Sequence, residues 1–157
     1  MSKIRVLIVD DSIFFRKFLA DRLSALPNIE IAGFAVNALE AKYVIPQIKP
    51  DVVTLDVEMP GLSGTEVISH IMASSPVPIV MVSALNINVF EALSAGAVDF
   101  VKKPDANIPG AAEKFINELA EKISIARNAH FHKPAPAPPP APVFKQPSKS
   151  VIIAPSI

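Results

Sequence analysis

Short apolar runs alternate with longer segments in which apolar residues are spaced more widely. Nearly continuous apolar runs lie at 4–9, 51–55, 78–82 and 98–101, and a looser alternating run lies at 29–34. Runs of this length with little polar interruption are typical of strands covered on both faces of a parallel sheet. The pattern therefore predicts five strands, with the one at 29–34 nearer an edge of the sheet.

The segments between the strands have helical periodicity. Apolar residues recur every fourth position from Phe15 to Leu23, which predicts a stripe that packs on the sheet. In the next helix, Leu39 and Tyr43 are expected to face the core, and Pro46 is expected to fray or end the helix. The first predicted helix begins at Asp11 or Ser12 and ends near residue 26. The other four are predicted at 38–48, 65–73, 86–95 and 109–128.

Strand and helix alternate five times, which favours an α/β protein with a parallel sheet and helices on both faces. The expected fold is a flavodoxin-like, doubly wound, five-stranded sheet in the order 2-1-3-4-5. In that order the first, third, fourth and fifth strands are consecutive neighbours, so residues that follow them should meet at one edge.

Composition narrows the class of protein. Half of the residues are hydrophobic and 19% are charged, which is typical of a globular domain. All fifteen acidic residues lie in 1–129 with twelve Lys and Arg, a net charge of −3, so nucleic-acid binding is not expected. There is no cysteine, no signal peptide and no apolar run near the roughly 20 residues that span a bilayer, so a soluble cytoplasmic protein is expected.

The last part of the chain differs from the rest. Eight of the sixteen prolines lie in 130–157, and most of them alternate with alanine. Such a sequence favours extended polyproline II and cannot build a core. We therefore expect a domain at 1–128 and a Pro/Ala-rich linker at 129–150. Residues 151–157, from Val151 on, are expected to be the start of a second domain whose remainder is not present.

Polar residues follow four of the predicted strands. They are Asp10 and Asp11, Asp56, Ser83 and Lys103. Three carboxylates are unlikely to remain ionised together without a counter-charge. Mg²⁺ supplies one, because it prefers oxygen ligands and shares its shell with water and phosphate. Taken alone, the first acidic pair could equally be a helix cap.

In this combination the chain resembles the receiver domain of two-component response regulators over about residues 3–127. Within that family it is most similar to the N-terminal domain of the chemotaxis protein-glutamate methylesterase (CheB) group. The matching stretches are VLIVDDS at 6–12, TLDVEMP at 54–60 and GAVDFVKKP at 96–104.

The resemblance implies a phosphorylation switch. Asp56 would be the nucleophile that accepts a phosphoryl group from a phosphohistidine on a sensor histidine kinase. Mg²⁺ would be held by Asp11, Asp56 and the backbone carbonyl of Glu58, and Asp10 would act mainly through water. Lys103 and Ser83 would contact phosphoryl oxygens. The Glu58 side chain, two residues after Asp56, could approach the metal or face solvent.

The resemblance also implies a conformational response. Ser83 would move toward the phosphorylated residue and Phe100, at the switch-aromatic position, would turn inward. A cis peptide bond between Lys103 and Pro104 is implied as well. The receiver would catalyse its own phosphorylation and dephosphorylation and would regulate an attached methylesterase domain. No methylesterase activity is expected from this chain, because the Gly-Ala-Ser-Thr-Gly-Gly turn of that domain is missing.

Two other functions compete with this one. The chain could be a phosphorylation-dependent binding module for a different effector, which sequence beyond Ile157 would reveal. An aspartate-nucleophile phosphatase is disfavoured, because those enzymes have an Asp-x-Asp pattern after the first strand and here Asp10 and Asp11 are adjacent.

Overall fold

The computed structural model describes residues 3–57, 64–84, 93–94 and 96–128 of the chain. Its five strands form one parallel sheet in the order β2-β1-β3-β4-β5, which confirms the predicted topology and places β2 at an edge. The helix predicted at 86–95 lies mostly outside the described residues. The strands are β1 (Ile4–Val9), β2 (Ile29–Ala35), β3 (Val52–Asp56), β4 (Ile79–Ser83) and β5 (Asp99–Lys102), and the helices are α1 (Ile13–Ser24), α2 (Ala38–Ile48), α3 (Gly64–Ser74) and α5 (Ala111–Asn128).

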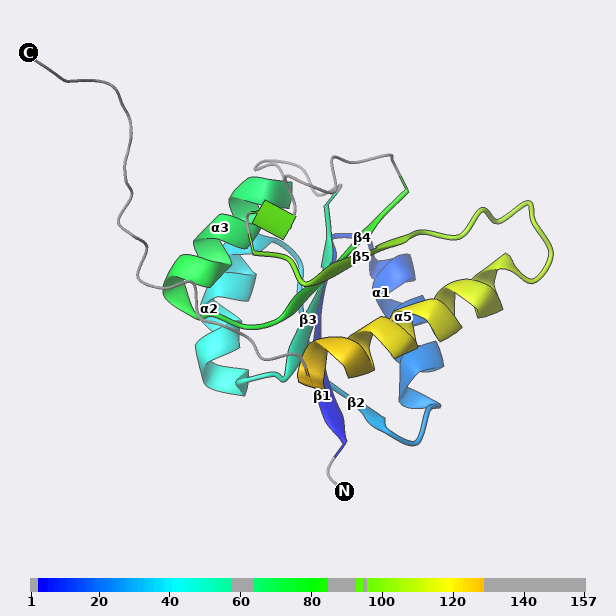
Figure 1. Cartoon of the computed structure of the whole chain (residues 1–157), viewed down its shortest axis with the longest axis horizontal. Coiled ribbons are helices and arrows are strands. Elements are labelled where there is room, and N and C mark those ends of the chain that lie inside the picture. The colour runs from blue at the N-terminus through cyan, green and yellow to red at the C-terminus, as the bar shows by residue number, and fades with distance from the viewer. Residues whose placement is uncertain (1–2, 58–63, 85–92, 95, 129–157) are drawn as a thin grey trace, which may run out of the picture.

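Helices cover both faces of the sheet, with α2 and α3 on one side and α1 and α5 on the other (Figure 1). Strand residues alternate between two buried clusters: Leu7 and Val9 pack with α2 and α3, whereas Val6 and Ile8 pack with α1 and α5. Both faces of β1 and β3 are therefore buried from solvent, which explains why the sequences of these strands are almost continuously apolar. None of the helices in the described part of the chain is long and apolar enough to cross a bilayer.

The buried face of α2 differs from the prediction. Ala41 and Ile45 are its buried residues, whereas Leu39 and Tyr43 are 78% and 70% exposed, so the prediction that those two face the core is wrong. Ala38, Val44 and Ile48 pack beside Ala41 and Ile45. The buried stripe therefore follows the three- and four-residue spacing of this set and not that of Leu39 and Tyr43.

The bounds of α2 confirm the predicted span of 38–48, but the expectation that Pro46 frays or ends the helix is wrong. The helix continues past Pro46 to Ile48, and its C-cap is Lys49, whose φ of 54° is left-handed. Arg5 stabilises this end, because its Nη1 donates to the carbonyl oxygens of Ile48 at 2.7 Å and Lys49 at 3.0 Å. These bonds satisfy carbonyl groups that have no partner within the last turn of a helix.

Gly33 allows α2 to pack against the edge strand. The pairing of β1 with β2 shifts register between Val6 and Leu7, which oppose Ile31 and Gly33, so β2 contains a bulge. A Cβ atom at Gly33 would lie 2.6 Å from Cδ1 of Ile48. A larger residue at this position would therefore require the Ile48 side chain at the end of α2 to shift.

Candidate functional site

Four strands deliver polar residues to one edge of the sheet. Asp10 directly follows β1, Asp56 and Ser83 are the last residues of β3 and β4, and Lys103 directly follows β5. The backbone N–H of Lys103 donates to the carbonyl oxygen of Ser83 at 2.8 Å, which continues the ladder one step beyond the paired strands. The parallel register therefore brings together residues that are far apart in sequence.

Three carboxylates form the centre of this edge. Asp10, Asp11 and Asp56 each contribute an oxygen atom, and these atoms all lie within 4.8 Å of one another. Asp10 and Asp56 are only 1% and 5% exposed, whereas Asp11 faces solvent. Lys103 supplies a counter-charge, with Nζ 3.3 Å from Oδ2 of Asp56. Within the described residues, the Lys103 ammonium offsets the charge of one carboxylate out of three, so the cluster attracts further positive charge.

Hydrogen bonds fix the loop between β1 and α1. The backbone N–H of Ser12 donates to Oδ1 of Asp10 at 2.8 Å, and Oγ of Ser12 caps α1 by accepting from the N–H of Phe15 at 3.2 Å. Arg16 Nη1 donates to the carbonyl oxygen of Asp10 at 2.8 Å. Of the two predicted capping residues, Ser12 is the one that caps the helix, and Asp11 is left to project toward solvent.

Asp10 is the most perturbed acid of the cluster. Burial raises its pKa from 3.8 to about 6, and the nearby negative charge of Asp56 adds to the increase. The N–H of Ser12 and the ammonium of Lys103 act in the opposite direction and lower the pKa. Its Oδ2 atom is buried and accepts no hydrogen bond from the part of the chain that the structure describes.

The donor set fits a divalent cation. All three side chains offer carboxylate oxygens, which are the ligands that Mg²⁺ prefers. Oδ2 of Asp10 is a second indication: it is buried and no described residue donates a hydrogen bond to it, so when Asp10 is ionised an ion or a water molecule would stabilise it. Asp10, Asp11 and Asp56 could thus hold Mg²⁺ among them.

Lys103 has a neighbour that the sequence analysis did not include in the site. Its Nζ lies over the ring of Phe15 on α1, 4.5 Å from the ring centroid. The spacing of apolar residues placed Phe15 on the buried stripe of α1, and spacing alone cannot show that a lysine from another strand lies against the ring. The Lys103–Pro104 peptide is not cis, since the described residues contain no cis bond; that prediction is wrong, and the observed isomer is the one favoured for most X–Pro bonds.

Two further predicted residues have different outcomes. Phe100 on β5 is half-buried and packs against the cluster beneath α2 and α3. Its carbonyl oxygen accepts a hydrogen bond from Nζ of Lys122 on α5 at 2.8 Å, which ties β5 to α5. Glu58 lies outside the described residues.

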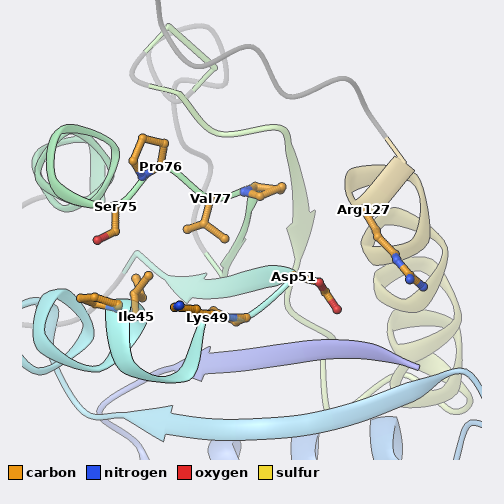
Figure 2. Close-up of a pocket in the computed structure, with 10 residues that line it drawn as sticks. Ile45, Lys49, Asp51, Ser75, Pro76, Val77 and Arg127 are labelled. Carbon is orange, nitrogen blue, oxygen red and sulfur yellow. The ribbon is translucent and has the colours of Figure 1, made fainter. Parts of the chain in front are cut away.

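A pocket of about 580 Å³ lies at the opposite edge of the sheet (Figure 2). Asp51, Val77 and Pro78 line it just before β3 and β4 begin, and Arg127 reaches it from the end of α5. Among the described residues, Asp51 is the only acidic residue in its lining, and Oδ2 of Asp51 accepts the backbone N–H of Arg5 at 2.8 Å. The part of the pocket that the structure describes therefore contains no second carboxylate cluster like that of Asp10, Asp11 and Asp56.

Comparison with known proteins agrees with this arrangement. Residues 6–109 match the response regulator receiver domain family. A protein-glutamate methylesterase/protein-glutamine glutaminase 2 of Syntrophomonas wolfei is 48% identical over 135 residues, covering 86% of this chain and 40% of the relative. The corresponding Thermotoga maritima protein is 43% identical over 129 residues, covering 80% of this chain and 38% of that protein. The chain thus spans about two fifths of the length of these curated relatives.

Solved structures give the same result. The response regulator domain of Thermotoga maritima CheB has a TM-score of 0.73 and 43% identity, covering 81% of this chain and 98% of that domain. A chain from the complex of the P1 domain of CheA3 with CheY6 from R. sphaeroides has a TM-score of 0.67 and 28% identity, covering 82% of this chain and 100% of that chain. The chain therefore belongs to the response regulator receiver domain family, and within it is similar to the receiver domain of CheB-type methylesterases.

Proposed function

We propose that the chain is a phospho-accepting receiver in which Asp56 takes a phosphoryl group from a phosphohistidine of a sensor histidine kinase. The observation that carries the proposal is the setting of Asp56. This nearly buried carboxylate ends the central strand β3, lies 3.3 Å from the ammonium of Lys103 and shares a cluster with two other acids.

The chemistry needs little beyond positioning and charge. An oxygen of Asp56 attacks phosphorus, the bond between phosphorus and the histidine nitrogen breaks, and the phosphoryl group remains on Asp56 as an acyl phosphate. Mg²⁺, when held by Asp11 and Asp56 with Asp10 acting through water, would neutralise charge on the transferred group. Lys103 and Ser83 would contact phosphoryl oxygens, the first as a point charge and the second as a hydroxyl donor.

The conformational response would run through β4 and β5. Ser83 ends β4 and pairs with Lys102 at the end of β5, so a shift of Ser83 toward phosphorylated Asp56 displaces the strand that carries Phe100. Phe100 would then turn inward and change the surface formed by β5 and α5. The Lys122 contact with the Phe100 carbonyl supports this coupling, because it joins the two elements directly.

Apolar side chains around the site support docking of the kinase. Phe14 and Ile13 at the start of α1 are 85% and 64% exposed, and Ile108 in the loop before α5 is 56% exposed. Ile108 also lines a largely apolar pocket of about 590 Å³, together with Phe15 and Lys103. Exposed apolar surface of this kind marks interaction sites. A phosphohistidine domain seated there would reach Asp56.

The output would be regulation of an attached methylesterase domain. The methylesterase relatives are more than twice as long as the part that this chain matches, which supports a second domain. In this proposal residues 1–128 are the receiver, 129–150 the Pro/Ala-rich linker and 151–157 the start of the second domain. The exchange would take place in the cytoplasm.

The experiment is incubation with Mg²⁺ and acetyl phosphate, followed by intact mass measurement. The natural chain should gain one phosphoryl group, and a chelator should prevent the gain. Asp56→Asn should gain none. Asp21→Asn is the matched control, because Asp21 is exposed on α1 and pairs only with Lys17 at 3.9 Å among the ion pairs described for it. Equal labelling of Asp56→Asn and the natural chain would refute the assignment.

A further inference from the structure

We propose that Phe15 is a positioning residue for Lys103, and that the face of its ring holds the ammonium group at the acidic site. The kinetic consequence of this contact rests on the proposed function, whereas the contact itself does not. Nothing in the receiver motif points to residue 15, whose spacing on α1 predicts packing alone.

The geometry places the ammonium between two attractive partners. Nζ of Lys103 lies 3.3 Å from Oδ2 of Asp56 and 4.5 Å from the ring centroid of Phe15. The negative face of an aromatic ring attracts a cation within about 6 Å of the centroid. The Lys103 side chain is only 17% exposed, so both attractions act where water is partly excluded.

The ring is itself held in place. Phe15 contacts the rings of Phe18 and Phe115 at centroid distances of 5.7 and 5.9 Å, and those two rings lie 6.3 Å apart. This aromatic cluster (Phe15, Phe18 and Phe115) joins α1 to α5. The backbone N–H of Phe15 also donates to the capping hydroxyl of Ser12. The ring therefore cannot move without disturbing both helix packing and the loop that carries the acids.

A lysine at this site needs such support. Its ammonium is strongly hydrated and sits on a flexible four-carbon stem, so attraction to carboxylates by itself fixes the position of the ammonium only loosely. The ring adds an attraction that is only weakly directional, unlike a hydrogen bond. The ammonium can therefore turn from Asp56 toward an arriving phosphoryl oxygen while it remains over the ring.

A purely structural role for Phe15 makes a different prediction. Phe18 lies on the same helix and in the same aromatic cluster, and it is also half-buried. The cation over its ring is the guanidinium of Arg22, at 5.2 Å, and not Lys103. If packing alone matters, changes at Phe15 and Phe18 should affect the site equally. Phe18 is thus the matched control.

The test replaces Phe15 alone with mono-, di- and trifluorinated phenylalanine by nonsense suppression, since the chain has nine phenylalanines. Fluorine withdraws charge from the ring face and leaves ring shape nearly unchanged. Two quantities are measured: the NMR shift of the Lys103 ε-methylene protons in the unphosphorylated protein, and the rate constant of labelling by acetyl phosphate with Mg²⁺. The same series at Phe18 is the control, and urea midpoints verify folding.

We expect the Lys103 ε-methylene shift and the labelling rate constant to change stepwise with fluorination at position 15, and neither to change with fluorination at position 18. The ε-methylene protons should lose their upfield ring-current shift as the ammonium leaves the ring. The labelling rate should fall by about two- to fivefold across the series, the factor expected for a partly exposed cation–π contact. A Phe15 series without a trend in the Lys103 shift, or a Phe18 series with the same trend, would overturn the proposal. If no variant is labelled, the proposed function fails, and the Lys103 shift still decides whether the contact exists.

Discussion

Replacing Asp10 with asparagine should stabilise the metal-free protein at neutral pH. The folded protein holds this carboxyl at a pKa of about 6, against an ordinary value of 3.8, chiefly because it is buried. Between these two values the folded state binds more protons than the unfolded state, so stability falls as pH rises. Above pH 6 the full cost of the buried charge is present.

The magnitude follows from the two pKa values. Each pKa unit corresponds to about 1.4 kcal/mol, so ionised Asp10 destabilises the folded state by at most about 3 kcal/mol at pH 7. Asparagine removes the charge, and its Oδ1 can still accept the N–H of Ser12, as Asp10 does at 2.8 Å. Allowing for imperfect relaxation around the new amide, we expect a gain of about 1–3 kcal/mol in the free energy of unfolding.

Urea denaturation with a chelator present measures this difference. At pH 7, Asp10→Asn should unfold at higher urea than the natural chain, and by pH 4 the advantage should shrink to about a fifth of its value, because Asp10 is then protonated in the folded state. Adding Mg²⁺ should narrow the gap, since the cation stabilises the natural chain more. If Asp10→Asn is less stable than the natural chain at pH 7 with chelator, or if its advantage does not depend on pH, the account of the buried charge is wrong.

Three other substitutions test the packing, each by urea denaturation at pH 7. Thr54→Val should raise the free energy of unfolding by about 1 kcal/mol, because Oγ1 of Thr54 is buried and has no hydrogen-bond partner among the described residues; a loss of stability would show that the hydroxyl is satisfied. Gly96→Ala should cost about 2–3 kcal/mol, because φ is 125° and a Cβ would lie 2.9 Å from Cγ of Met72. Gly110→Ala, at φ 80° with open space around it, should cost only about 1 kcal/mol, and equal losses at the two glycines would contradict the steric argument.

The sheet and its polar edge were predictable because two features of the sequence determine them: the spacing of the apolar residues, and the position of each polar residue relative to the end of a strand. A strand buried on both faces, such as β1, must be apolar almost throughout, and the residue after it must lie at the edge of the sheet where the carboxyl ends of the strands meet. Once the strand order is known, Asp10, Asp56 and Lys103 have to converge, and the 3.3 Å ion pair between the last two confirms that they do. Neither inference depends on how individual side chains pack.

The failures concern packing between elements. Leu39 and Tyr43 have helical spacing and apolar character, yet α2 turns Ala41 and Ile45 toward the sheet, because a second set of residues with the same spacing lies on that face. Phe15 is similar, since its position on α1 was predictable but the lysine over its ring comes from a distant strand. Contacts of this kind depend on how each helix is rotated about its own axis and on how close it lies to the sheet. The spacing of apolar residues in the sequence does not specify either.

The central claim is that Asp56 carries the phosphoryl group, and chemical trapping tests it most directly. Borohydride reduces an acyl phosphate to an alcohol and converts the labelled aspartate to homoserine. After phosphorylation and reduction, trypsin separates Asp56 from Asp10 and Asp11, because Arg16 and Lys42 lie between them. The account predicts homoserine at position 56 and aspartate at positions 10 and 11. Homoserine at either of those positions, with intact Asp56, would contradict it.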